Sequence, residues 1–318
     1  MISMGCEISR AGVEEARNRI AGHVRRTPSI RVAAADLGLD LTGEIVLKLE
    51  LLQCAGSFKP RGAFNRILSA GRPPRVLAAS GGNHGVAVAY AARALEIEAE
   101  IFVPEIVSPV KLARLRALGA SVQVVGRDYQ DALDASQVRA RETGALVVHA
   151  YDQPEVLLGA GTVGLELMDD APDLDTVLVA TGGGGLVGGI ATAYAGAARV
   201  VSVEPTRSCA LSRALREGRP VEVEVGGIAK DSLGARRVGD LAFAVCVQHG
   251  VTAVEIPDES IAEAQRQLSA ALGLIAEPGG ATALAALVSG AYAPREGERV
   301  GVVVCGCNAD PASAVFGR

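Results

Sequence analysis

Apolar residues along the chain follow two alternating patterns: short apolar runs, and longer segments in which apolar positions recur at helical spacing. The short runs predict β-strands and the longer segments predict α-helices. In the first half this alternation predicts strands at 75–79, 99–103, 121–125 and 146–149 and helices at 83–95, 108–118 and 129–142. Such a series indicates parallel strands joined by right-handed crossovers, with helices covering both faces of the sheet.

A second series of the same kind fills the C-terminal half of the chain. It predicts strands at 176–180, 199–204 and 299–305 and helices at 154–168, 186–195, 208–217, 258–272 and 280–289. The segment 219–239 is rich in Gly and Val without a clear period, so it is predicted to be irregular. The first series is preceded by a helix that Ser9 caps and by a strand at 45–50.

Together the two series predict an α/β protein with two lobes, built from parallel-rich open sheets flanked by helices. A chain of 318 residues exceeds the size at which a single core stops growing. We therefore expect a large domain formed by residues 1–74 and 151–318, and a smaller inserted domain formed by residues 75–150.

Composition and charge exclude several classes of protein. Hydrophobic residues make up 49% of the chain but aromatics only 3%, so small aliphatic residues must fill the core. The net charge of −5 is spread out, and no Lys/Arg run indicates a nucleic-acid partner. The N-terminus lacks the apolar region of a signal peptide, which favours a cytoplasmic location. The charge-free run 176–198 is long enough for a membrane span, but its four consecutive glycines favour a strand, loop and helix.

Lysine is scarce, which makes Lys59 a conspicuous candidate for amine chemistry. Of the 31 Lys+Arg residues only four are lysine, and Lys59 directly precedes Pro60. Proline fits the first position of a helix, where a missing N–H costs nothing. The amine of Lys59 is therefore predicted at the mouth of a helix, facing a groove.

A glycine-containing loop, Ala78–Gly85, lies between a predicted strand and a predicted helix, at the carboxyl end of a parallel sheet. Free backbone N–H groups and the helix dipole at such a place favour an anion, for example a substrate carboxylate. Asn83 and His84 add side-chain donors to the same loop. The alternative for Asn83 is that it only caps the helix.

A second strand-to-helix loop contains the consecutive glycines Gly182, Gly183, Gly184 and Gly185. Several N–H donors of such a loop can surround one phosphate group. Gly183-x-Gly185-x-x-Gly188, with Glu204 further on, also fits a dinucleotide-binding fingerprint, so a nicotinamide-dependent oxidoreductase is an alternative.

That alternative gives Lys59 no role, whereas a phosphorylated aldehyde cofactor uses both the lysine and the glycine loop. Pyridoxal phosphate needs a Schiff-base lysine, a phosphate site and a partner for its pyridine nitrogen. The last predicted strand ends at Cys305, which would bring a thiol to the carboxyl edge of the larger sheet. The alternative for Cys305 is a small buried apolar residue.

Five motifs carry a resemblance to a known family. They are Ser57–Ala63, Ser80–Gly85, Gly182–Gly185, Glu277–Ala281 and Cys305–Asn308. In this order and across nearly the whole chain they resemble the serine/threonine dehydratase and serine racemase family of pyridoxal-phosphate enzymes, which has the tryptophan-synthase-β fold (fold type II).

The resemblance implies a set of cofactor-binding residues. Lys59 would form the Schiff base, and Phe58 would pack on the cofactor ring. Asn83 would bind the ring 3-hydroxyl, the Gly182–Gly185 loop would bind the phosphate, and Cys305 would face the pyridine nitrogen. Glu277 would line the ring side of the pocket. The residues that the resemblance places at the substrate are Ser80, Gly81, Asn83 and His84.

Two departures from the family pattern are informative. Racemases of the family have a serine where this chain has Gly81, so racemisation should be poor. The family's divalent-cation site pairs a glutamate matching Glu204 with an acidic residue six positions later, where this chain has Ala210. No metal site is therefore expected there, and the scattered cysteines, which have no accompanying histidine, indicate neither a zinc site nor a disulfide framework.

The resemblance implies a pyridoxal-phosphate-dependent dehydratase, that is, an ammonia-lyase. It would convert a β-hydroxy amino acid, L-threonine or L-serine by default, to a 2-oxo acid and ammonia by α,β-elimination. Lys59, its pKa lowered by burial, would remove the Cα proton. A β-replacement enzyme of the cysteine-synthase type and a relative that keeps the cofactor without turnover are alternatives. The expected partners are a small amino-acid substrate and a second copy in a homodimer, with no nucleic acid and no membrane.

Overall fold

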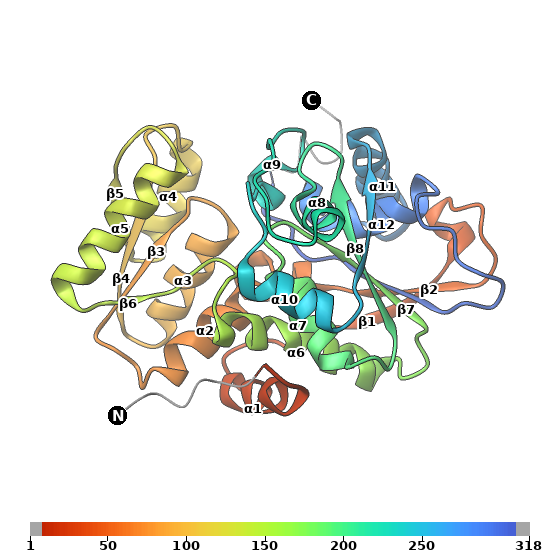
Figure 1. Cartoon of the computed structure of the whole chain (residues 1–318), viewed down its shortest axis with the longest axis horizontal. Helices are drawn as coiled ribbons and strands as arrows, with labels where there is room; N and C mark the ends of the chain where they lie inside the picture. The colour runs from red at the N-terminus through yellow and green to blue at the C-terminus, as the bar shows by residue number, and fades with distance from the viewer. Residues whose placement is uncertain (1–7, 310–318) are drawn as a thin grey trace.

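The structure is a computed structural model that describes residues 8–309, and it contains two separate sheets covered by helices (Figure 1). The four-stranded sheet is parallel throughout, and its strands follow the spatial order β5 (Ser121–Val124), β4 (Glu98–Val103), β3 (Arg75–Ala79) and β6 (Leu146–Val147). The helices between its strands are α3 (Asn83–Ala94), α4 (Pro109–Ala117) and α5 (Tyr129–Thr143). The bounds of all seven elements lie within two residues of the predicted ones, and the largest difference is at β6, which ends two residues earlier.

The six-stranded sheet combines segments from before and after the four-stranded one. Its spatial order is β1 (Ser29–Ala33), β2 (Glu44–Lys48), β10 (Val300–Val303), β7 (Thr176–Ala180), β8 (Arg199–Pro205) and β9 (Thr252–Ile256). Every neighbouring pair is parallel except β1 with β2. The predicted α/β fold class is confirmed, and the antiparallel edge strand β1 is an addition to it.

Eight further helices accompany the larger sheet in the described part of the chain. They are α1 (Arg10–Ile20), α2 (Lys59–Ser69), α6 (Pro154–Asp170), α7 (Gly185–Tyr194), α8 (Ala210–Glu217), α10 (Asp240–Gln248), α11 (Asp258–Leu272) and α12 (Pro278–Val288). One short helix, α9 (Lys230–Leu233), lies in the segment predicted to be irregular. In Figure 1 the four-stranded sheet with α4 and α5 is on the left and the six-stranded sheet is on the right.

Glycine allows the helices to pack closely in a core that is poor in aromatic residues. A Cβ atom at Gly161 of α6 would lie 2.6 Å from the carbonyl oxygen of Gly189 in α7. The two helix backbones are therefore in direct contact, and a larger side chain would push them apart. This contact holds α7, and with it the glycine loop at its start, against the rest of the larger sheet.

The apolar run 176–198 forms β7, the glycine loop and the whole of α7, as predicted. Within residues 8–309, no helix has the length and apolar character needed to cross a membrane. The two-domain division at residues 75–150 is not tested by these observations and stays a prediction.

Candidate active site

Lys59 is the first residue of α2, and Pro60 occupies the first turn. Its Nζ donates a hydrogen bond to the carbonyl oxygen of Ala150 at 2.6 Å and lies 5.0 Å from the ring centroid of Phe58. Desolvation lowers the pKa of Lys59 to about 8, although Cys305 and Glu277 act in the opposite direction. A substantial fraction of this amine is therefore neutral near neutral pH, and a neutral amine can act as a nucleophile or a base.

Tyr151, the residue after Ala150, packs its ring against the glycine loop, so the Lys59 contact and the loop are neighbours in the fold. A Cβ at Gly183 would lie 2.3 Å from a ring carbon of Tyr151, and Gly184 has a φ of +94°. Glycine is needed at both positions, for space at the first and for backbone conformation at the second. The Tyr151 hydroxyl donates to the Arg237 carbonyl at 3.3 Å, which fixes the ring against the loop.

The glycine loop forms a cradle at the N-terminus of the ten-residue helix α7. Among the described residues, no acceptor takes a hydrogen bond from the backbone N–H of Gly182, Gly183 or Gly184. Unpaired N–H groups at a helix N-terminus bind phosphate well, because the helix dipole adds to the hydrogen bonds. The loop is therefore suited to an anion that lies within reach of the Lys59 region.

Asn83 is the first residue of α3, but its side chain does not cap that helix. Its Nδ2 donates to Glu277, and its Oδ1 accepts from Nδ2 of Asn308. The helix-cap alternative for Asn83 is wrong, because both polar atoms contact residues of the C-terminal motifs. The amide thus connects the loop of the smaller sheet to the edge of the larger one.

The other residues of that loop differ in what they offer. Ser80 Oγ accepts from the N–H of Gly82 at 3.1 Å, and a Cβ at Gly81 would lie 2.8 Å from Val107 Cγ2. His84 is buried, and its Nε2 lies 2.8 Å from the carbonyl oxygen of Val148, which can only accept. Burial, with the charge of Lys59, lowers the pKa of His84 to about 3, so the ring is neutral.

This geometry changes the expectation for His84. Its ring N–H is committed to Val148 and is not free for a substrate carboxylate, although the sequence suggested such a side-chain donor. The backbone N–H groups at the start of α3, the Ser80 hydroxyl and one hydrogen of Asn83 Nδ2 are donors that remain at the loop.

Cys305 and Glu277 belong to the C-terminal motifs and lie close enough to Lys59 to influence its pKa. The N–H of Phe58 donates to the carbonyl oxygen of Cys305 at 3.2 Å, which places the end of β10 beside the start of α2. The Cys305 thiol donates to the Gly279 carbonyl at 3.3 Å, and burial together with the nearby Glu277 raises its pKa, so the thiol stays neutral. Burial raises the pKa of Glu277 to about 7, against the hydrogen bond from Asn83.

Glu204 is occupied by a contact within the fold. Both carboxylate oxygens accept backbone N–H groups at the start of α8, from Leu211 at 2.9 Å and from Ser212 at 2.7 Å. Glu204 is also fully buried, so it does not present a carboxylate oxygen to the ribose hydroxyl that the dinucleotide-binding alternative requires. Within residues 8–309, no group of three or more His, Cys, Asp or Glu side chains could hold a metal ion.

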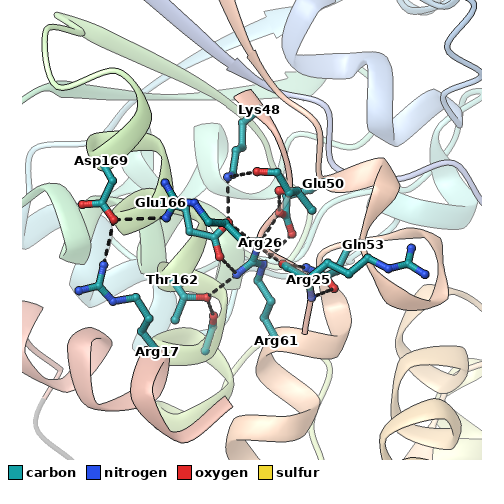
Figure 2. A network of polar contacts seen from close by, with 12 residues as sticks. Arg17, Arg25, Arg26, Lys48, Glu50, Gln53, Arg61, Thr162, Glu166 and Asp169 are labelled. Carbon is teal, nitrogen blue, oxygen red and sulfur yellow. Dashed lines mark hydrogen bonds and ion pairs between the residues drawn. The ribbon is translucent and has the colours of Figure 1, made fainter. Parts of the chain in front are cut away.

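Sequence reasoning missed a buried ion network that anchors the start of α2 (Figure 2). Arg61 is fully buried and makes paired hydrogen bonds to Glu50 at 2.7 Å and to Glu166 at 2.8 Å. Lys48, also fully buried, donates to Glu166 at 2.8 Å. Burial opposes ionisation of Glu166, but the hydrogen bonds and charges of Arg61 and Lys48 outweigh it and keep its pKa below the usual range.

A sequence signal for this network did exist. Glu166 lies between leucines in an otherwise apolar stretch of α6, and Arg61 lies among buried residues of α2. A charged residue at a buried helical position needs an opposite charge. The sequence does not say which residue supplies it, because Arg61 and Glu166 are 105 positions apart.

The fold and the site together define an enzyme class. A lysine with a lowered pKa, a glycine cradle for phosphate, a neutral thiol and a fixed amide surround one region between two α/β sheets. These residues fit a phosphorylated aldehyde cofactor, because they supply an amine for the aldehyde and N–H donors for the phosphate.

Comparison with known proteins identifies this cofactor. Residues 20–306 match the family model described as pyridoxal-phosphate dependent enzyme, and the chain belongs to this family. The nicotinamide alternative is therefore wrong.

Three similar proteins illustrate the range within the family. The chain is 34% identical to an L-threonine ammonia-lyase of Thermotoga maritima, over 95% of this chain and 76% of that protein. It is 39% identical to a phenylserine dehydratase of Ralstonia pickettii, over 84% of this chain and 83% of that protein. The solved structure of maize serine racemase has a TM-score of 0.87 and 30% identity, covering 95% of this chain and 94% of that chain. The predicted resemblance and the fold type II architecture are thus confirmed.

Proposed function

We propose that the protein is a pyridoxal-phosphate-dependent dehydratase that acts on a small β-hydroxy amino acid, L-threonine or L-serine. The products would be a 2-oxo acid and ammonia, formed by α,β-elimination. The observation that carries this proposal is the Lys59 amine, whose pKa is lowered to about 8. It donates to the carbonyl of Ala150, and the next residue, Tyr151, packs its ring on Gly183 of the phosphate cradle. The names of the similar ammonia-lyase and dehydratase support the same reaction class.

Each side chain of the site has a role in this proposal. The Gly182–Gly185 loop would hold the cofactor phosphate, Phe58 would pack on the ring, and Asn83 and Cys305 would contact ring atoms. When bound, the cofactor supplies an electron sink for the bond that breaks at Cα. The backbone N–H groups at the start of α3 would bind the substrate carboxylate.

Lys59 would take the Cα proton, because a neutral amine of lowered pKa is a base of suitable strength near neutral pH. A neutral thiol at Cys305 would not keep the pyridine nitrogen protonated, whereas a negatively charged carboxylate partner would. With an unprotonated nitrogen the ring would withdraw electrons less strongly. The electrons released at Cα would then expel the β-hydroxyl and not remain in the ring.

A substrate screen tests this proposal. The purified protein is incubated with threonine, serine, 3-hydroxyaspartate and phenylserine, and release of 2-oxo acid and ammonia is measured. We expect release from at least one of the first two. Absence of 2-oxo acid with all four would contradict the proposal. Incorporation of added sulfide into the product would favour the β-replacement alternative.

The lowered pKa of Lys59 predicts how cofactor uptake depends on pH. The neutral amine reacts with an aldehyde, so the rate at which cofactor-free protein takes up pyridoxal phosphate should rise with pH and level off above about 8. Stopped-flow absorption measurements at a series of pH values would record this. A rate that keeps rising to the ordinary lysine pKa of 10.5 would show that burial does not lower the pKa of this amine.

Gly81 predicts negligible formation of D-serine from L-serine, because no hydroxyl group faces the substrate at that position. Chiral chromatography of the reaction mixture would measure it. Gly81→Ser alone should form little D-serine, since its Cβ would lie 2.8 Å from Val107 Cγ2, and the double variant Gly81→Ser/Val107→Ala should form more. Appreciable D-serine from the unsubstituted protein would show that another residue serves that face.

Removal of divalent cations should leave the enzyme unchanged. The backbone N–H groups of Leu211 and Ser212 already occupy both oxygens of Glu204, and residue 210 is alanine. We expect equal turnover and equal unfolding temperature with and without EDTA. A loss of either that added Mg²⁺, Ca²⁺ or Mn²⁺ restores would demonstrate a cation site.

We also propose the domain division and the assembly. Residues 75–150 would form a smaller domain that gates the substrate, because the four-stranded sheet comes from this segment alone. The enzyme would work in the cytoplasm as a homodimer. Sedimentation equilibrium of the purified protein would test the homodimer by its molar mass.

A further inference from the structure

Two side-chain amides, those of Asn308 and Asn83, form a hydrogen-bonded series that connects the Ala55 carbonyl to Glu277. Asn308 uses Nδ2 twice, donating to the carbonyl oxygen of Ala55 at 2.8 Å and to Oδ1 of Asn83. Asn83 in turn donates from Nδ2 to Glu277. The dehydratase proposal gives Asn308 no role, although it belongs to the last of the five motifs.

The contact with the Ala55 carbonyl fixes the donor-to-acceptor direction of this series of hydrogen bonds. A backbone carbonyl can only accept a hydrogen bond, so Ala55 requires the NH₂ side of Asn308. That NH₂ also faces Asn83, which must then present its oxygen to Asn308 and its own NH₂ to Glu277. The two sides of an amide have nearly the same shape, so the hydrogen-bond network decides which way it faces.

The backbone around Ala55 is held in an unusual conformation that serves this contact. Ala55 has a φ of +59° and Gly56 a φ of +74°, both in the left-handed region. For alanine this region is strained, because its Cβ approaches the following carbonyl oxygen. A Cβ at Gly56 would lie 2.4 Å from Oδ1 of Asn308, so glycine is needed to admit the Asn308 side chain.

The amide of Asn308 is therefore held from two sides. The strained turn presents the Ala55 carbonyl to its NH₂ on one side, and Oδ1 of Asn83 accepts from it on the other. The N–H of Cys307 donates to the Gly56 carbonyl at 2.9 Å, which holds the turn beside residue 308. Backbone strain persists only where the surrounding structure over-determines it, and it commonly marks a functional position. The turn lies three residues before Lys59, in the loop that leads into the active site.

We infer that Asn308 is a positioning residue that makes Asn83 present an N–H group to the cofactor ring oxygen. One hydrogen of Asn83 Nδ2 goes to Glu277, and the other is available to a bound molecule. A donor at that place stabilises the deprotonated form of the ring oxygen, because a hydrogen bond to a charged acceptor is stronger than one to a neutral group. This inference rests on the proposed contact between Asn83 and the cofactor ring.

Asn308→Asp tests the inference with almost no change in shape. A carboxylate only accepts, so Asn83 would have to turn its NH₂ toward residue 308 and its oxygen toward Glu277 and the cofactor. We expect the dissociation constant for pyridoxal phosphate, measured by equilibrium dialysis of the holoprotein, to rise roughly 10- to 100-fold. The pH at which the absorption of the bound cofactor titrates should also rise, because the ring oxygen has lost its donor.

Two further variants complete the experiment. Asn308→Ala removes the donor without introducing a charge, and it should weaken cofactor binding in the same direction if the Asp variant does not fold. Cys307→Ala changes the neighbouring side chain, whose thiol contacts the Leu51 and Gly56 carbonyls, and should leave the cofactor titration unchanged.

The outcomes separate this inference from the proposed function. If the unsubstituted protein binds no pyridoxal phosphate, the proposed function fails and the inference fails with it. If the unsubstituted protein binds it and the Asn308 variants have the same dissociation constant and titration, only the inference is overturned. A lower unfolding temperature with an unchanged cofactor titration would show a purely structural role and would also overturn it.

Discussion

Lys59→Ala should lower kcat/KM for 2-oxo acid formation by at least about 10³-fold, because loss of a positioned acid–base group costs 10²–10⁴-fold before any loss of covalent attachment is added. In the structure this amine donates to the Ala150 carbonyl and lies near the Phe58 ring and Cys305. The other three lysines are engaged elsewhere or exposed: Lys48 pairs with Glu166, Lys111 pairs with Asp231, and Lys230 is exposed. The variant should still bind pyridoxal phosphate through the glycine loop, but reversibly.

Borohydride reduction followed by mass spectrometry measures directly whether the cofactor is attached covalently. The unsubstituted protein should keep the cofactor covalently, and Lys59→Ala should lose it on dialysis. Lys230→Ala is a matched control, because Lys230 is an exposed lysine of α9. It should keep both the activity and the covalent label. Normal turnover in Lys59→Ala would refute the assignment of this lysine.

The second large effect concerns stability. Arg61→Leu should destabilise the protein by about 3–5 kcal/mol, the usual cost of removing one partner from a buried ion pair. The reason is that Glu50 and Glu166 would remain buried, with Lys48 as the nearest remaining positive charge. The midpoint of urea unfolding of the holoprotein should fall accordingly.

Arg66→Leu provides the matched control on the same helix. Arg66 pairs with Glu155 at 3.0 Å, but both side chains remain about one-fifth exposed. Solvent reaches this pair, and ion pairs that solvent reaches are worth up to about 1 kcal/mol, so the shift should be much smaller than for the fully buried Arg61. Equal shifts for the two variants would show that the buried network around Arg61 contributes no more than a surface ion pair.

The sequence predicted best those parts of the site that are local in the chain. The helix start at Lys59, the glycine loop before α7 and the loop before α3 are contiguous motifs whose turn chemistry determines their structure. The strands and helices of the 75–150 segment were equally clear, because short apolar runs alternate there regularly with segments of helical period.

What the sequence did not predict depends on contacts between distant segments. The strands β1 and β9 are short and half-exposed, and α10 lacks a distinct polar face, so periodicity gave no signal for them. Tyr151 contacts the glycine loop and His84 contacts Val148 only because the fold brings those segments together. The hydrogen bonds of the Ala55 to Glu277 amide chain likewise join residues 194 to 253 positions apart in the sequence.

The position of β10 in the larger sheet has a consequence for the biosynthesis of the protein. This strand, Val300–Val303, lies between β2 and β7, so it joins the segment that carries Lys59 to the segment that carries the glycine loop. During translation the β1–β2 pair and the β7–β8–β9 group are both made before β10. They cannot join into one sheet until residues 300–303 leave the ribosome. We therefore expect nascent chains that stop before β10 to expose unpaired edges of β2 and β7, and to depend on chaperones until the strand inserts.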